Sequence, residues 1–331
     1  MQILIFLLYI ELFSELFYWL FMFKISGAYC AVLTPLNNNL SINNELHLRH
    51  CQSLMQKGLD GLTIFGTNGE ASSFSISQKI QTIEFLLENR IDASNLLIGS
   101  GSSSLEDAIT LTKFSAKVGS KASLLIPPFY FKNVTDDGVI TYYRNVIEST
   151  GDNEFKFLLY NIPQHSGVTI NFNIIENLLK LYPNNVVGLK DSTGNIDNML
   201  KTIKYFNNFA VFCGNGAMAL HTSRRGGAGA ITGDANITAK LLSFIIHNFK
   251  KEKEIDNFND LQILIENIRN VLSSHEQISL LKAYYSIADR MEEWNNVMPP
   301  LKKIDNPSNN KQVTALLDLV GQIDTLVPSS S

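Results

Sequence analysis

From Gly27 onward, the sequence alternates short, apolar, β-rich runs with longer amphipathic stretches. The alternation occurs eight times and predicts repeated βα units, because a strand followed by a helical crossover pairs in parallel with the next strand. The short runs are almost wholly apolar, which is typical of strands covered on both faces. We expect strands over residues 28–33, 61–65, 95–99, 122–126, 155–160, 186–189, 209–212 and 229–232.

Eight βα units in roughly 220 residues match the size of a TIM barrel rather than an open sheet. The expected fold class is therefore α/β, a TIM (β/α)8 barrel over residues 22–240 followed by a C-terminal helical region over residues 241–331. Amphipathic patterns predict helices between the strands and in the C-terminal region. They include residues 76–89, 105–117 and 170–181 in the barrel and 252–272, 277–291 and 312–326 beyond it.

Composition narrows the classes of function. The 331 residues include 27 Lys and Arg against 31 Asp and Glu, so the net charge of -4 gives no reason to expect a nucleic-acid partner. Cys30, Cys51 and Cys213 are odd in number and far apart, which indicates neither a disulfide framework nor a zinc site. A reducing, cytoplasmic compartment and no bound metal are expected.

An N-terminal extension, residues 1–21, is long and apolar enough to span a bilayer. Glu11 and Glu15 oppose that interpretation, because each buried acidic residue costs roughly 2.5 to 3.5 kcal/mol on insertion. A cleaved signal peptide needs a basic start, whereas Lys24 is the first positive side chain and follows the apolar run. Translation from Met22 is a further alternative. Membrane contact is expected only if the extension is retained.

In a TIM barrel the chemistry is built from residues just past the strands. The second predicted strand is followed by Gly66-Thr67-Asn68-Gly69-Glu70, whose glycines allow backbone N–H groups to converge on an anion such as a carboxylate. A tight βα turn is the simpler interpretation of the same residues. Tyr130 and Tyr160 follow the fourth predicted strand and end the fifth, where single tyrosines usually serve in packing.

The sixth predicted strand runs directly into Lys190. A lysine at this position points its amine into the barrel mouth, where a low dielectric disfavours the ammonium form. The neutral amine can attack a carbonyl carbon. An ordinary lysine is only about 0.04% neutral at pH 7, so lowering its pKa by two units raises the reactive fraction roughly a hundredfold. Pairing with a carboxylate such as Asp191 is the structural alternative.

Four motifs in the same order and spacing closely resemble the dihydrodipicolinate synthase and N-acetylneuraminate lyase family of class I aldolases, and the likeness extends over about residues 22–325. They are Gly66-Thr67-x-Gly69-Glu70, Tyr130 after a proline, Tyr160-Asn161-x-Pro163 with Gly167, and Gly188-x-Lys190. The resemblance implies a TIM barrel with a C-terminal helical region that acts on pyruvate or on compounds that yield it. It also implies a homo-oligomer, a dimer of dimers.

The resemblance assigns catalytic roles to four residues. Lys190 would form an imine with the C2 carbonyl of the 2-oxo acid, and Tyr160 would hydrogen-bond near the imine and shuttle a proton. Thr67 would link Tyr160 to Tyr130 in a proton relay, and in many members the latter residue reaches in from the neighbouring subunit. No cofactor or metal is implied, because the protonated imine itself accepts electrons.

The resemblance also implies how the substrate is bound. The backbone amides of Thr67 and Asn68 would hold the carboxylate of pyruvate, and Ile231 would line the pyruvate pocket. His165 stands where synthases that use aspartate semialdehyde resemble one another in an arginine that grips the second carboxylate. A histidine is mostly neutral at pH 7 and lacks the guanidinium fork. It would act here as a pocket wall, a hydroxyl donor or an acid–base group.

The partners implied are pyruvate and an aldehyde. The acidic pair of the sialic acid lyases is missing, since residues 214–217 read Gly-Asn-Gly-Ala. The chain then resembles the family's broad group of 2-keto-3-deoxy sugar acid aldolases and related lyases, which implies such a compound as the substrate. The alternatives are a 4-hydroxy-tetrahydrodipicolinate synthase, which condenses pyruvate with aspartate semialdehyde, and a catalytically silent barrel that binds a 2-oxo acid. The sequence leaves the direction of the reaction and any feedback site open.

Other enzyme classes fit less well. Gly99-Ser100-Gly101 follows a strand, as in a dinucleotide-binding dehydrogenase, but Ser104 replaces the third glycine. Residues 226–229, Gly-Gly-Ala-Gly, lack the Lys that completes a phosphate loop. A metal hydrolase needs clustered ligands, whereas the histidines are scattered apart from His47 and His50, which share one helix face. We expect these histidines to be surface or core residues.

Overall fold

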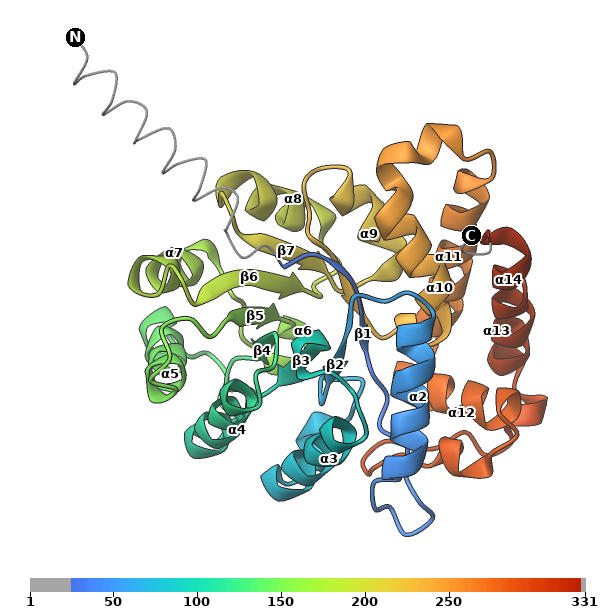
Figure 1. The fold of residues 1–331 in the computed structure, drawn as a ribbon, viewed down its shortest axis with the longest axis horizontal. Coiled ribbons are helices and arrows are strands. Elements are labelled where there is room, and N and C mark those ends of the chain that lie inside the picture. Colours follow the sequence, from blue (N-terminus) through green and yellow to red (C-terminus); the bar gives the residue numbers. More distant parts are fainter. Residues whose placement is uncertain (1–24, 329–331) are drawn as a thin grey trace.

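A computed structural model describes residues 25–328, in which eight parallel strands form a closed barrel (Figure 1). The predicted TIM barrel is confirmed. Each strand pairs with the next along the chain, and the last pairs with the first. The strands are β1 (Gly27–Ala31), β2 (Gly61–Ile64), β3 (Leu96–Gly99), β4 (Ala122–Leu125), β5 (Phe157–Asn161), β6 (Val186–Asp191), β7 (Ala210–Cys213) and β8 (Gly229–Thr232).

Helices cover the outside of the barrel, and most begin at a residue whose side chain caps the free N–H groups of the first turn. Ser75 forms a capping box with Gln78, and Ser104 accepts from the backbone N–H of Asp107. These local signals explain why the helix starts could be predicted. The helices are α2 (Asn44–Gln56), α3 (Ile76–Glu88), α4 (Leu105–Lys117), α5 (Asp136–Ser149), α6 (Pro163–Ser166), α7 (Phe172–Leu181), α8 (Ile196–Tyr205), α9 (Gly216–Ser223) and α10 (Ala235–Asn248).

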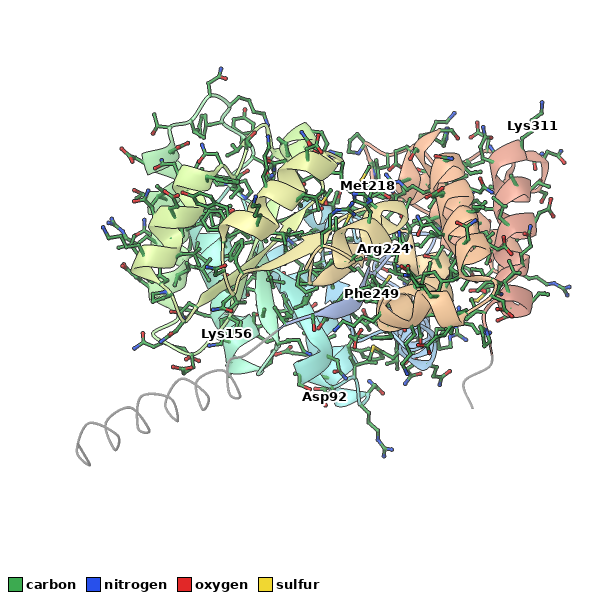
Figure 2. All side chains as sticks on the ribbon, turned by 90° about the horizontal axis from the view of Figure 1, so that it is seen from above. Asp92, Lys156, Met218, Arg224, Phe249 and Lys311 are labelled. Atoms are coloured by element: carbon green, nitrogen blue, oxygen red, sulfur yellow. The ribbon has the colours of Figure 1, made fainter. Side chains whose placement is uncertain are left out.

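The C-terminal region packs against one side of the barrel, as Figure 2 shows for the orange and red ribbons that end beyond Lys311. The helix expected over residues 252–272 is two elements, because extended backbone at Ile255 separates them. Helix α10 runs through residue 240, where the barrel was expected to end, and the two-part division stays a prediction. The elements are η3 (Phe249–Glu254), α11 (Phe258–Ser273), α12 (Gln277–Ala288), η4 (Glu292–Asn295), η5 (Pro307–Asn309), α13 (Lys311–Gly321) and α14 (Ile323–Leu326).

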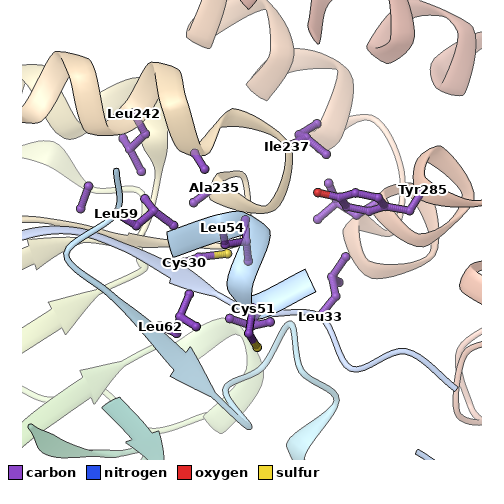
Figure 3. Packing of buried hydrophobic residues seen from close by; sticks show 14 of the residues in the cluster. Cys30, Leu33, Cys51, Leu54, Leu59, Leu62, Ala235, Ile237, Leu242 and Tyr285 are labelled. Atoms are coloured by element: carbon purple, nitrogen blue, oxygen red, sulfur yellow. The ribbon is translucent and has the colours of Figure 1, made fainter. Parts of the chain in front are cut away.

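The barrel and the C-terminal region share one hydrophobic core. Figure 3 shows Cys30 of β1, Leu54 of α2 and Leu242 of α10 in this cluster, with Tyr285 of α12 reaching in from the C-terminal side. All four side chains are buried. Each Å² of apolar surface that is removed from water stabilises the folded state by about 25 cal/mol. The C-terminal helices are therefore part of the same folding unit as the first strands.

The apolar extension expected over residues 1–21 lies outside the described residues. Within residues 25–328, none of the helices has the length and hydropathy needed to span a bilayer.

Candidate active site

Lys190 lies inside the barrel near the carboxyl end of β6. The strand runs to Asp191, two residues further than predicted, because Tyr160 and Asn161 of β5 pair with Lys190 and Asp191. Side chains alternate along a strand, so Lys190 and Asp191 face opposite sides of the sheet. Lys190 is only 2% exposed, and its Nζ lies 4.3 Å from the centroid of the Tyr160 ring.

Asp191 is held by polar partners outside the barrel interior. Its carboxylate accepts hydrogen bonds from Thr193 Oγ1 at 2.6 Å, Thr193 N at 2.8 Å, Asn198 Nδ2 at 3.2 Å and Asn161 Nδ2 at 3.4 Å. Lys190 is not among these partners. An ion pair between the neighbours Lys190 and Asp191, the structural alternative for this lysine, is therefore not formed.

Tyr160 joins Lys190 to the loop that follows β2. The Tyr160 side chain is 4% exposed, and its Oη lies 3.2 Å from Thr67 Oγ1, a distance that allows a hydrogen bond. Since β2 and β5 are not neighbours in the barrel, this contact spans the barrel mouth. The structure thus brings three of the four predicted catalytic residues together.

The loop after β2 presents free backbone donors. In the described chain, the backbone N–H groups of Thr67 and Asn68 have no hydrogen-bond partner, whereas those of Gly69 and Glu70 bond to carbonyls within the loop. Free N–H groups on consecutive residues form a concavity suited to an anion. Phe65 and Glu70 both have φ of 55°. A non-glycine residue in this left-handed region costs about 1–3 kcal/mol and persists only where its surroundings hold it.

Ile231 belongs to the packed interior of the barrel. It is fully buried on β8, in the same cluster as Tyr160 and Phe212. Its role in lining a pyruvate pocket stays a prediction.

Tyr130 and His165 lie on the same end of the barrel but do not meet the other residues. Tyr130 is 75% exposed, and its ring packs edge-to-face against that of Phe131, which is 74% exposed. His165 is exposed on α6. Within residues 25–328, neither side chain reaches Lys190, Tyr160 or Thr67 through a hydrogen bond.

One candidate residue was missed by the sequence reasoning. Lys132 follows the exposed aromatic pair, and its Nζ donates to the carbonyls of Phe129 and Ser166, the latter at 3.0 Å. Ser166 directly follows His165 in α6, so the structure fixes an ammonium group beside the turn that carries the histidine. Its position two residues after Tyr130 was the only available signal.

The two histidines that share a helix face are core residues. His50 Nε2 lies 2.9 Å from Asn236 Oδ1, while neither ring nitrogen of His47 has a partner in the described chain. Burial lowers the pKa of His47 to about 3 and that of His50 to about 4, so both are neutral at pH 7. Among residues 25–328, no three His, Cys, Asp or Glu side chains form a cluster suited to a metal ion.

A cavity of about 850 Å³ lies at the opposite ends of the strands, against Val187, Ala210 and Ala228. Val187 and Ala210 stand at the beginnings of β6 and β7, whereas Lys190 stands near the end of β6. This cavity is therefore separate from the Lys190 amine.

Comparison with known proteins agrees with the geometry. The model of the dihydrodipicolinate synthetase family matches residues 24–319. The chain is 28% identical over 291 residues to an uncharacterized DapA-like lyase of Chloroflexus aurantiacus, covering 88% of this chain and 94% of that protein. It is 32% identical over 238 residues to the 4-hydroxy-tetrahydrodipicolinate synthase of Pelagibacter ubique, covering 71% and 76%.

Solved structures share the fold. Dihydrodipicolinate synthase from Agrobacterium tumefaciens superposes with a TM-score of 0.79 at 25% identity, covering 91% of this chain and 99% of that one. The sialic acid aldolase of Ruminococcus gnavus gives a TM-score of 0.82 at 19% identity, covering 92% and 100%, which speaks for the fold alone. The chain is a lyase that belongs to the dihydrodipicolinate synthetase family.

Proposed function

We propose that this lyase forms a Schiff base with pyruvate and makes or cleaves a carbon–carbon bond between pyruvate and an aldehyde, with a 2-keto-3-deoxy sugar acid as the substrate. One observation carries the proposal: the buried Lys190 amine lies beside Tyr160, whose hydroxyl is within hydrogen-bond reach of Thr67. An amine held in an apolar interior next to a proton carrier is suited to imine chemistry.

In the cleavage direction, the neutral Lys190 amine attacks C2 of the 2-oxo acid, and Tyr160 gives its proton to the departing oxygen. Water leaves, which gives a protonated imine and a Tyr160 phenolate. Tyr160 takes the proton from the C4 hydroxyl, the C3–C4 bond breaks, and the electron pair enters the imine to form an enamine. The aldehyde leaves, the enamine is protonated at C3, and water releases pyruvate. The amides of Thr67 and Asn68 hold the carboxylate throughout, and Ile231 lines the pocket.

The reaction sequence is tested by borohydride trapping. Incubation with pyruvate and borohydride is expected to add one reduced pyruvate irreversibly to Lys190, as peptide mass spectrometry would show. Lys190→Arg is expected to abolish both the adduct and turnover. Lys79→Arg is a matched control, because Lys79 is a second buried lysine, whose pKa burial lowers to about 8. An adduct on Lys79 instead of Lys190 would contradict the proposal. The absence of an adduct with any 2-oxo acid would contradict it too and would favour a silent binding protein.

A second candidate is the synthase reaction with aspartate semialdehyde, which the name of the Pelagibacter relative and the position of Lys132 favour. The Lys132 ammonium, beside His165, offers the positive charge that histidine lacks for a second carboxylate. Pyruvate release from 2-keto-3-deoxygluconate should be compared with condensation onto the semialdehyde. If only the semialdehyde reacts, and Lys132→Met raises its KM, the synthase is the correct assignment.

We further propose a cytoplasmic homotetramer built from two dimers. The support is the exposure of the neighbouring aromatic side chains Tyr130 and Phe131 on the catalytic end of the barrel. Large apolar side chains exposed side by side are typical of contact surfaces. In such an assembly Tyr130 completes the proton relay of a neighbouring subunit.

A further inference from the structure

The loop that carries Thr67 and Asn68 ends in a buried carboxylate. The side chain of Glu70 is 1% exposed, and its Oε2 accepts a hydrogen bond from the backbone N–H of Met298 at 2.7 Å. Its Oε1 accepts from Lys282 Nζ of α12. Glu70 is separated from these partners by more than two hundred residues, so the contact ties the catalytic loop to the C-terminal region.

Lys282 is completely buried and is held on two sides. Besides Glu70, its Nζ donates to the carbonyl of Asn296 at 2.9 Å. Burial lowers the pKa of Lys282, and the Glu70 carboxylate acts in the opposite direction by favouring the ammonium form. A charge without a partner at this depth would be costly, because desolvation is compensated only within a paired and hydrogen-bonded arrangement.

The same loop rests on a second anchored segment. An added Cβ at Gly233 would lie 2.5 Å from the amide group of Asn68, so the two residues are in close contact. The next residue, Asp234, accepts hydrogen bonds from Arg269 Nη1 at 2.8 Å and from Gln277 Nε2 at 3.2 Å, both in the C-terminal region. The carboxylate-binding side of the mouth is thus fixed by contacts with the C-terminal helices.

We propose that Glu70 and Lys282 are positioning residues for the 2-oxo acid, an inference that rests on the proposed function. Their ion pair holds the strained loop so that the free amides of Thr67 and Asn68 face the substrate carboxylate. The Lys282 ammonium also cancels the negative charge of Glu70. The Cα atoms of Glu70 and Asn68 are two residues apart and therefore lie within about 7 Å of each other. Without Lys282, the negative charge of Glu70 would repel an anion that approaches the Asn68 amide.

The two functions of the pair predict a graded series of variants. Lys282→Met leaves Glu70 charged and unpaired, and should raise the half-saturating pyruvate concentration at least about tenfold. Glu70→Gln keeps the acceptor for Met298, removes the negative charge, and should raise it only about threefold. The double variant Glu70→Gln/Lys282→Met buries no charge and should match Glu70→Gln rather than Lys282→Met.

Borohydride trapping at increasing pyruvate concentrations measures this value without the second substrate. The maximal trapping rate at saturating pyruvate should stay within about threefold of wild type, since Lys190 is not touched. Lys302→Met, which removes an exposed ion pair with Asp305 at 3.0 Å, is the control and should change neither quantity. Thermal unfolding of each variant should be recorded in parallel.

The proposal is overturned if both single variants keep the wild-type half-saturation, or if only the melting temperature falls. Should Lys282→Met fail to fold, the double variant still decides, because wild-type half-saturation in a folded double variant contradicts positioning by the pair. Failure of the proposed function gives a different result, namely no pyruvate adduct on Lys190 in the wild-type protein.

Discussion

Replacing Thr67 with valine tests whether the hydroxyl pair at the barrel mouth moves a proton. Thr67 Oγ1 lies 3.2 Å from Tyr160 Oη, and valine keeps the shape of threonine while it removes that oxygen. A neutral hydrogen bond contributes about 0.5–1.5 kcal/mol, which corresponds to an expected loss in kcat of about 2- to 13-fold. Tyr160→Phe removes the proton carrier itself and should cost roughly 10²- to 10⁴-fold.

The double variant Thr67→Val/Tyr160→Phe decides how the two residues are related. If Thr67 acts through Tyr160, the double variant is no slower than Tyr160→Phe alone, because groups that act as a unit are not additive. Thr63→Val is the matched control. Thr63 lies on the same strand, β2, and its buried hydroxyl has no hydrogen-bond partner in the described part of the chain, so turnover should be unchanged.

Pyruvate release from a 2-keto-3-deoxy sugar acid, measured at saturating substrate across a pH series, gives the required values of kcat. A double variant slowed by the product of the two single effects would refute the relay, because it would show that the hydroxyls act independently. Equal slowing by Thr63→Val and Thr67→Val would refute it too, since the effect would then come from packing.

Two further predictions concern stability. Gly188→Ala places a Cβ 2.2 Å from the carbonyl oxygen of Ala210. Overpacking of this kind destabilises a fold by about 1–3 kcal/mol, so calorimetry should show a lower Tm. An unchanged Tm would contradict the close approach of these two strands. The hydrogen bond with the Asp60 carboxylate raises the pKa of His247. The stability that this pair contributes is therefore complete below pH about 6.5, the ordinary pKa of histidine, and is lost as the pH rises through the raised pKa. His247→Asn should therefore lower the unfolding free energy by less than about 1 kcal/mol at pH 6 and by nothing at pH 9; an equal effect at both values would exclude titration of His247 as the cause.

The barrel could be predicted because its signals are local. Each strand is a short apolar run, because burial on both faces restricts it to apolar side chains. Most helices between the strands begin at a residue whose side chain caps the first turn. Strand ends were less certain, since pairing decides them: Lys190 is part of β6 because Tyr160 lies opposite it on β5. The helix expected over residues 252–272 was wrong near its start, where the backbone at Ile255 is extended.

The anchoring of the site could not be predicted in the same way. Glu70 belongs to a recognisable motif, but its partner Lys282 lies 212 residues away in a helix whose apolar pattern gives no sign of a buried ammonium. Lys132 is likewise an ordinary surface lysine until the turn at Ser166 is placed beside it. Such pairs depend on which loops the fold brings together, and a single sequence does not show which loops these are.

Contacts between neighbouring strands and contacts with the C-terminal region hold different parts of the site. Lys190 and Tyr160 stand on neighbouring strands in fixed register, so any barrel with this strand order places the amine beside the phenol. Thr67 lies in the loop after β2, a strand that borders neither β5 nor β6, and its position depends on that loop being held by Glu70 and the C-terminal helices. Under the proposed function, the barrel would therefore position the groups for the covalent chemistry, and the C-terminal region would position those that bind the carboxylate. Variants of Lys190 and Tyr160, and Thr67→Val through the loss of its hydroxyl, should lower kcat. Variants of Glu70 and Lys282 should instead raise the half-saturating concentration of pyruvate.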